Sequence, residues 1–151
     1  FTAADICHMH KMWLGSVYAW AGAYRRVNMS KSEFPFAAAA QVPALMREFE
    51  RGPLRRHTPC TFNSADRVIQ ALAEVHAELV LIHPFRDGNG RVARILATLM
   101  ALQAGLLLDF RPIQGSRREA YFSAVQAGIA RNYAPMKQVF SGIVRRSFGG
   151  P

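Results

Sequence analysis

The chain has 151 residues, half of them hydrophobic, and its mean hydropathy is +0.01. This length and composition fit one domain over residues 1–151 with a single hydrophobic core, and they exclude an intrinsically disordered chain. Nineteen Lys and Arg against ten acidic residues give a net charge of +9. Such a charge favours polyanionic partners in general, which leaves nucleotide phosphate, nucleic acid and an acidic protein all open.

Targeting signals are absent from the printed sequence. No stretch reaches the roughly 20 apolar residues that span a bilayer, so we expect no membrane segment. We find no signal peptide, so we expect a cytoplasmic protein. The chain starts at Phe1 rather than Met, so we expect that some N-terminal residues are missing from this sequence. Cys7 and Cys60 lack the spacing of metal ligands and are predicted to be free thiols.

The first half of the chain predicts two helices and a hairpin. Hydrophobic residues spaced three and four apart indicate a helix over 4–17, which Trp20-Ala-Gly22 ends. Residues 27–36 favour a β-hairpin or extended flap, with Lys31-Ser-Glu33 between two short runs. A second helix is predicted over 41–51 and stopped by Gly52-Pro53, with a loop over 55–63.

The second half predicts four more helices. Ser64 is a good N-cap for a helix over 65–82, and Pro84 then forbids simple continuation. After a tight loop, the next helix begins at Asn89 or Gly90 and runs to 103, and we interpret the apolar run 95–108 as a buried core helix. Further helices are predicted over 116–130 and 134–146. The expected fold is therefore an all-α bundle with one small β-hairpin flap.

The segment 83–94 combines the residue types that phosphate chemistry needs. His83 suits the role of a base at neutral pH, because an unperturbed imidazole has a pKa near ~6.5. Gly88, Asn89 and Gly90 let backbone N–H groups point into one concavity at the start of a helix, which favours an anion. Arg91 and Arg94, three residues apart, are expected to reach one side and bind phosphate oxygens. Asp87 is a natural Mg²⁺ ligand beside a polyphosphate, so the set predicts phosphoryl or nucleotidyl transfer.

This segment resembles the signature of the Fic family, HxFx[DE]GNGRxxR, and matches it at every fixed position: His83, Phe85, Asp87, Gly88, Asn89, Gly90, Arg91 and Arg94. The resemblance extends upstream, over Trp20-Ala-Gly22, Tyr24-Arg25, Val27 and Ser30-Lys31, and downstream over 121–140. It implies an all-α fold of the Fic type that uses ATP and Mg²⁺ to adenylylate Ser, Thr or Tyr on a target protein. It also leaves open delivery into a host cell.

Carried over by position, the resemblance assigns roles to single residues. His83 would deprotonate the target hydroxyl, and Asp87 would hold Mg²⁺ between the phosphates. The amides around Gly88, Asn89 and Gly90 would bind the phosphates, whose β- and γ-charges Arg91 and Arg94 would neutralise. Phe85 would pack the loop.

Two further sites follow from the resemblance. The flap over 31–36, with Lys31 and Phe36, would hold the target by strand addition. Tyr121 stands where relatives often contact adenine. A packing role, as a tyrosine half-buried between helices, explains this residue equally well. Some relatives have an Asn seven residues later, where this chain has Gly128.

The printed sequence lacks the inhibitory glutamate motif that many Fic proteins carry. Many Fic proteins carry an inhibitory helix, [ST]xxxE[GN], whose Glu pairs with the second motif arginine. No Glu of this chain fits that pattern. The Glu would therefore lie in a missing segment or on an antitoxin-like chain, where it would pair with Arg94; otherwise the enzyme is unrestrained.

Two alternatives remain open. Relatives move phosphate, phosphocholine or UMP, although Gly90 favours AMP because phosphate-moving relatives have Lys there. The other is a non-catalytic basic domain that binds nucleic acid, but neither a helix-turn-helix nor a basic strip with interleaved aromatics is evident. Outside the motif, His76 is expected to be a satisfied histidine beneath the site, and His8, His10 and His57 are expected at the surface or in packing.

Overall fold

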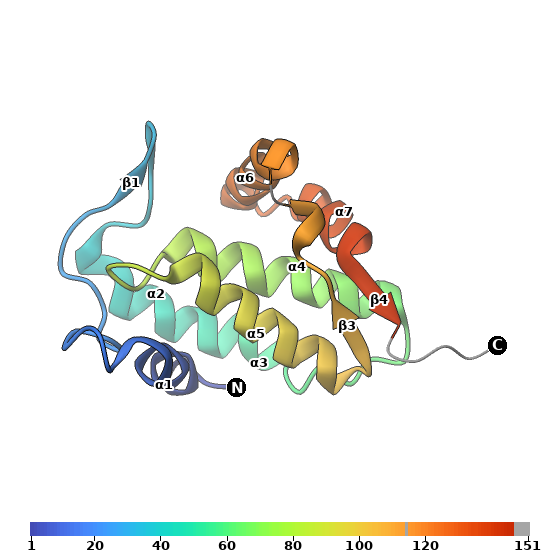
Figure 1. Cartoon of the computed structure of the whole chain (residues 1–151), viewed down its shortest axis with the longest axis horizontal. Helices are drawn as coiled ribbons and strands as arrows, with labels where there is room; N and C mark the ends of the chain where they lie inside the picture. The colour runs from blue at the N-terminus through green and yellow to red at the C-terminus, as the bar shows by residue number, and fades with distance from the viewer. Residues whose placement is uncertain (114, 147–151) are drawn as a thin grey trace.

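Helix α4, Ala65–Ile82, lies at the centre of the molecule (Figure 1). The computed structural model describes residues 1–113 and 115–146. Ser64 begins α4 by accepting a hydrogen bond from the N–H of Arg67, at 3.4 Å. Side chains around most of its circumference are buried, as expected for a helix covered on several sides.

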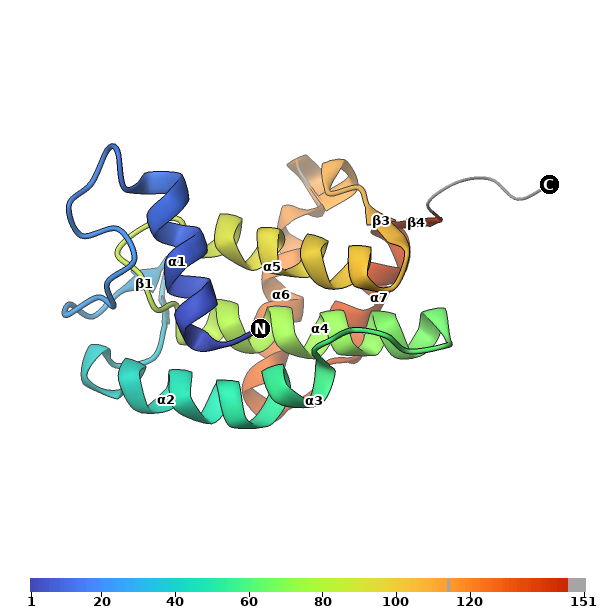
Figure 2. The ribbon, with the colours of Figure 1, turned by 90° about the horizontal axis from the view of Figure 1, so that it is seen from below.

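The other long helices pack around α4. Helix α5, Asn89–Gln103, and helix α7, Ala134–Ile143, make extensive contacts with it, and α6, Arg118–Ala127, makes fewer. Helix α1, Ala3–Leu14, packs against α5, and α2, Val42–Phe49, packs against α4 (Figure 2). Together these helices enclose one hydrophobic core. The fold is therefore the all-α bundle that the sequence predicted.

Short elements connect the helices. The flap is the antiparallel pair β1, Ser30–Lys31, and β2, Phe34–Pro35, and it stands away from the bundle (Figure 1). The remaining elements are η1 Ala39–Gln41, η2 Glu50–Leu54, α3 Arg55–His57, β3 Leu106–Leu108, η3 Arg111–Ile113, η4 Gly115–Arg117, η5 Gly128–Ala130 and β4 Val144–Arg146. The predicted hairpin is confirmed, with shorter strands than the sequence indicated.

The prediction that Gly52-Pro53 stops a helix is wrong. The helical path continues from α2 through the π-helical turn η2 into α3, which ends at His57. In this wider turn the N–H of Arg55 reaches the carbonyl of Glu50, five residues back. The extra residue gives room to Pro53, which has no N–H to donate and would crowd a regular α-helix.

The C-terminal prediction also needs correction. Helix α7 ends at Ile143, and β4 pairs antiparallel with β3, so that Leu107 lies opposite Arg145. Gly105, at φ +70°, turns the chain after α5 and lets Leu106–Leu108 extend. Because a short apolar run fits a strand as well as a helix, periodicity could not separate the two.

Residue 128 shows how tightly η5 packs on α4. A Cβ at Gly128 would lie 3.0 Å from Cδ1 of Leu81 and 3.4 Å from Cβ of Ala77. An Asn side chain at this position would clash with the same two residues, so close packing on α4 explains the glycine. Within residues 1–113 and 115–146, no helix has the length and apolarity that a membrane span requires.

We predict opposite effects of filling two helical glycines. Gly128→Val should lower the free energy of unfolding by about 1–3 kcal/mol, because the added methyl groups overpack the contact with Leu81. Gly142→Ala is the matched control, since no described atom beyond its chain neighbours and the backbone of its own helix lies within 4 Å of the new Cβ, and it should leave stability unchanged or raise it by up to ~1 kcal/mol. Urea unfolding measures both, and a Gly128→Val protein as stable as the parent would contradict this packing.

Candidate active site

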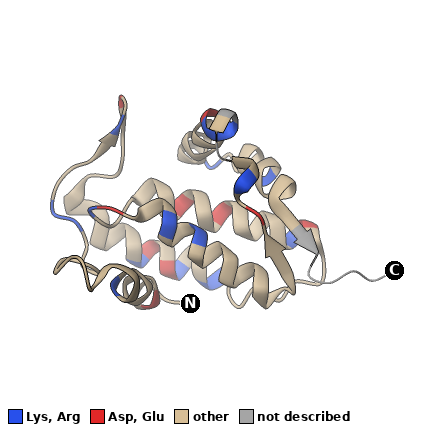
Figure 3. Cartoon of the chain, in the orientation of Figure 1, with Lys and Arg blue, Asp and Glu red and all other residues tan. Residues whose placement is uncertain are grey.

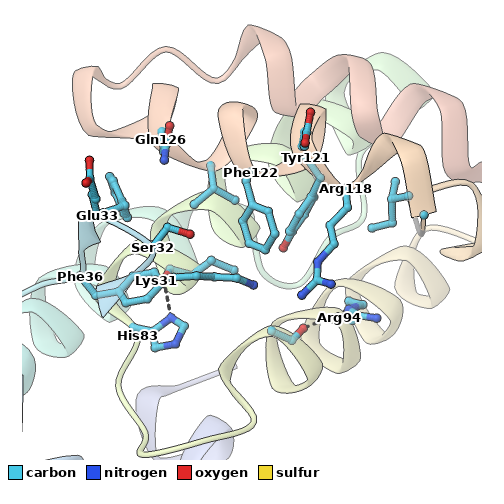
Figure 4. Close-up of a pocket in the computed structure, with 17 residues that line it drawn as sticks. Lys31, Ser32, Glu33, Phe36, His83, Arg94, Arg118, Tyr121, Phe122 and Gln126 are labelled. Atoms are coloured by element: carbon cyan, nitrogen blue, oxygen red, sulfur yellow. Dashed lines mark hydrogen bonds between the residues drawn. The ribbon is translucent and has the colours of Figure 1, made fainter. Parts of the chain in front are cut away.

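A cavity of about 1300 Å³ opens between the flap, the junction of α4 with α5, and α6. Figure 4 shows side chains from all of these elements converging on it. Its lining is Lys31, Ser32, Glu33, Phe34, Phe36, Val80, His83, Gly90, Arg94, Ile113, Gly115, Arg118, Glu119, Tyr121, Phe122, Val125 and Gln126. The flap, α5 and α6 all carry basic residues (Figure 3). Lys31, Arg94 and Arg118 outnumber Glu33 and Glu119 in the lining, and this excess of positive charge favours an anionic ligand.

His83 ends α4 in a left-handed conformation, at φ +51°. Its Nδ1 lies 3.1 Å from the carbonyl oxygen of Val80, which can only accept, so Nδ1 carries the ring proton. Nε2 of the neutral ring is then left with its lone pair. The ring of Phe36 stacks on the imidazole, with centroids 3.6 Å apart.

The surroundings of His83 hold the imidazole in its neutral form. Burial lowers its pKa to about 4, and the nearby charges of Arg25 and Lys31 act in the same direction. The hydrogen bond to Val80 and the charge of Asp87 oppose this shift without cancelling it. At neutral pH the side chain is therefore an unprotonated acceptor.

One adjacent and one distant side chain hold the loop that links His83 to α5. The side chain of Asn89 donates to the carbonyl of Phe85 and accepts from its N–H, both at 2.8 Å. His10 accepts from the N–H of Gly22 through Nδ1, and so donates through Nε2 to the carbonyl of Asp87, at 3.0 Å. The His10 ring also stacks on Phe85, with centroids 3.9 Å apart. His10 is fully buried, and its role here is packing and support.

The N-terminus of α5 presents backbone N–H groups at the edge of the cavity, which Gly90 lines. Gly88, at φ +80°, turns the chain into the helix, and its own N–H binds Oδ1 of Asp87 at 2.6 Å. The N–H of Arg91 bonds back to the carbonyl of Gly88. Over the described residues, nothing accepts from the N–H groups of Asn89 and Gly90, which have no intrahelical partner. These two groups, at the positive end of a 15-residue helix, can bind an anion.

The two motif arginines have different surroundings. Arg94 lines the cavity, and its Nε donates to the carbonyl of Gly90 at 3.3 Å. Arg91 instead lies over the ring of Trp13, 4.4 Å from its centroid, and pairs with Asp87 at 3.5 Å. Arg91 is not among the residues lining the cavity. The aromatic ring and the carboxylate hold Arg91 outside the cavity lining, and binding of one anion by both arginines stays a prediction.

Asp87 fits one part of a magnesium site. Its side chain is 62% exposed, and it faces the start of α5 through the hydrogen bond to Gly88. In the described ranges, no group of three or more His, Cys, Asp or Glu side chains could hold a metal ion. A single carboxylate still suits Mg²⁺, which is usually held by one or two carboxylates together with phosphate oxygens and water.

Phe122 is an aromatic residue of the cavity lining that the sequence did not indicate. Tyr121 lines the cavity, but its hydroxyl donates to Nε2 of the buried His76, at 2.7 Å, and the other ring nitrogen of His76 donates to Ala93. Burial lowers the pKa of His76 to about 4, so this histidine is the satisfied, neutral residue that was expected. The next residue on α6, Phe122, points into the cavity instead (Figure 4).

Two cations flank the Phe122 ring. Nζ of Lys31, on the flap, lies 3.7 Å from the ring centroid, and the guanidinium of Arg118 lies 5.7 Å from it. Burial and the charge of Arg118 lower the pKa of Lys31. Lys31 and Phe36, predicted as target-docking residues, thus contact α6 and His83 across the cavity. Arg118 carried no signal beyond its place in a pair of arginines.

Arg25 is a second residue whose importance the sequence did not reveal. Its side chain is buried, with 2% exposure, and its guanidinium donates to backbone carbonyls at both ends of the flap segment and at the end of α4. Burial lowers its pKa. In the sequence it stood only as one member of an arginine pair within the upstream resemblance.

Known proteins resemble this chain over most of its length. A model of the Fic/DOC family matches residues 1–101. The chain is 29% identical over 141 residues to the "Probable protein adenylyltransferase Fic" of Escherichia coli (strain K12), covering 90% of this chain and 66% of that protein. It is 29% identical over 146 residues to "Protein adenylyltransferase VbhT" of Bartonella schoenbuchensis, covering 95% of this chain and 29% of that one. The chain thus spans about two thirds of one relative and under a third of the other.

Solved structures show the same fold. The BepC effector of Bartonella tribocorum, with bound AMPPNP, superposes with a TM-score of 0.77 at 24% identity, over 96% of this chain and 75% of that one. The N-terminal Fic domain of a cell filamentation protein of Bartonella quintana, with bound ADP, gives a TM-score of 0.77 at 25% identity, over 96% and 73%.

Two neighbouring glycines should respond differently to alanine. Gly88→Ala should cost about 1–3 kcal/mol of stability, because it places a side chain at φ +80° and a Cβ 2.7 Å from Cζ3 of Trp13. Gly90→Ala should unfold at nearly the parent temperature, since the nearest atom to its Cβ is Nη2 of Arg94, 3.9 Å away. Its methyl group would still crowd the N-terminus of α5 and weaken binding of ATP. Thermal unfolding with and without Mg·ATP measures both effects, and equal loss of stability in the two variants would contradict the geometry.

The pKa of His83 can be measured by ¹⁵N NMR of the imidazole. Because burial lowers this pKa, His83 should stay neutral on acidification and take up a proton only as the pH falls through about 4. In the urea-unfolded chain it should titrate near ~6.5. Since the folded pKa is the lower one, the stabilising effect of neutral His83 is present above ~6.5 and is lost as the pH falls through about 4. A folded-state midpoint near ~6.5 would contradict burial of the ring.

Proposed function

The chain belongs to the Fic/DOC family, and on this basis we propose that it is a protein adenylyltransferase, which moves AMP from ATP to a Ser, Thr or Tyr hydroxyl of a target protein. One observation carries the proposal: His83, with an unprotonated Nε2, lines the same cavity as Gly90 and Arg94 at the start of α5. A base and an anion site that share one cavity supply what nucleotidyl transfer requires.

Binding of the nucleotide divides between two sides of the cavity. The triphosphate binds to the N–H groups of Asn89 and Gly90 and to the guanidinium of Arg94. The adenine ring stacks on the ring of Phe122. Asp87, kept in place by Arg91, would hold Mg²⁺, which supplies positive charge to the phosphates when bound. The flexible side chain of Lys31 lies between flap and α6 and adds a further positive charge.

The chemical step begins with the target hydroxyl beside Nε2 of His83. The hydroxyl oxygen bonds to the α-phosphorus, the bond from that phosphorus to the bridging oxygen of the β-phosphate breaks, and pyrophosphate leaves. The hydroxyl proton passes to Nε2 while the new bond forms, since an imidazole of such low pKa does not remove it beforehand. Arg94 and the α5 amides stabilise the charge that develops on the phosphates.

The target and any regulator meet the same cavity. The flap offers its backbone edge to an extended segment of the target, which strand addition would hold without a fixed target sequence. A glutamate from an antitoxin-like chain, or from a segment beyond this sequence, would pair with Arg94 and exclude the γ-phosphate. Cytoplasmic action or delivery into a host cell both fit this proposal.

The deciding experiment supplies ATP labelled on either the α- or the γ-phosphate to the protein and a lysate of candidate targets. Label that enters protein only from the α-position supports AMP transfer. Replacing His83 by Ala should slow it by ~10²–10⁴. His8→Ala is the matched control, because His8 is exposed and remote from the cavity lining. Label from the γ-position would show phosphate transfer instead, and absence of any His83-dependent label would reduce the site to binding.

A further inference from the structure

Arg25 is a buried cation with no anionic side chain beside it. Its exposure is 2%, and the part of the chain that the structure describes provides no carboxylate that pairs with it. Burying a charge without compensation is costly, so its partners must be found elsewhere. They are backbone carbonyls, and their positions show what the side chain does.

The guanidinium of Arg25 joins two parts of the site. Nε donates to the carbonyl of His83 at 2.6 Å, and Nη2 donates to that of Ile82 at 3.2 Å. Nη1 donates to Val27 at 2.8 Å, and Nη2 also donates to Ala37 at 2.5 Å. Ile82 and His83 end α4, whereas Val27 and Ala37 stand before and after the flap strands. One side chain thus fastens both ends of the flap to the end of α4.

Electrostatics and shape explain why arginine suits this place. The last carbonyls of α4 form the negative end of that helix, where a cation is stabilised. The planar guanidinium presents five N–H donors in a fixed fork, so it can serve carbonyls in several directions, whereas lysine has a single point of charge. The backbone N–H of Arg25 adds a fifth bond, to the carbonyl of Pro84 at 2.8 Å.

We propose that Arg25 is a positioning residue for the transfer reaction: it fixes His83 in its left-handed conformation and holds the flap so that Phe36 stays stacked on the imidazole. This inference rests on the proposed function, but Arg25 itself does not line the cavity. His83 donates Nδ1–H to Val80 only while its backbone keeps this conformation. Loss of the guanidinium therefore misplaces Nε2 while leaving Asn89, Gly90 and Arg94 on α5 unchanged.

The variants are Arg25→Lys, which keeps a charge without the fork, and Arg25→Met, which removes both. Arg26→Lys is the matched control, because Arg26 is the adjacent arginine and is exposed. In Arg25→Lys, kcat should fall by ~10–100-fold while the Kd for Mg·ATP changes by less than ~3-fold, since misplacement of a reacting group lowers the rate rather than ground-state binding. Arg26→Lys should match the parent in both.

Two further readouts do not depend on transfer activity. Hydrogen exchange should speed up at the N–H of Phe36, which bonds to Met29 across the base of the flap, and at the N–H of Ala37, which bonds to Leu81 of α4. The NMR signal of His83 should show loss of the Nδ1 proton's bond to Val80. These readouts test Arg25 even if the parent protein transfers no AMP, a result that would remove the proposed function alone. Parent-like exchange and parent-like His83 signals in both Arg25→Lys and Arg25→Met would overturn the inference.

Discussion

The site depends on how the chain passes from α4 to α5 within six residues. His83 and Gly88 both adopt left-handed backbone conformations, so the chain leaves one helix and enters the next at a sharp angle. A turn of this kind exposes backbone groups that need partners. Arg25 and His10 supply them from distant parts of the chain, and Asn89 supplies them from the first residue of α5. The catalytic geometry is therefore set by residues that do not line the cavity.

This arrangement divides the work among the motif residues. Asn89 uses its side chain to close the loop and leaves its N–H for an anion, and Arg91 lies over Trp13 and pairs with Asp87. His83 and Arg94 face the cavity. The motif thus contains both residues that hold the loop and residues that meet a ligand, and matching the motif does not distinguish these two kinds. Burial adds a further constraint, because it keeps His83 neutral.

The sequence predicted the parts of the fold that depend on local pattern. Helix α4 follows from its cap and periodicity, and the loop and α5 follow from the glycines and the motif. The sequence did not predict the elements whose conformation depends on contacts between residues far apart in the chain. Pairing between β3 and β4 joins segments far apart in sequence, and the π-helical turn at Pro53 is stabilised by packing of Leu54 in the core. The hydroxyl of Tyr121 donates to His76, whereas the neighbouring Phe122 points into the cavity (Figure 4). Nothing in the local sequence distinguishes the roles of these two aromatic residues.

A crystal structure of the protein with Mg²⁺ and a non-hydrolysable ATP analogue tests the central claim most directly. The account predicts that the triphosphate binds at the N–H groups of Asn89 and Gly90 with Arg94 beside it. It also predicts that the adenine ring lies against Phe122 and that the α-phosphate faces Nε2 of His83. Asp87 would lie on the metal. A nucleotide bound outside this cavity, or an α-phosphate turned away from His83, would contradict it.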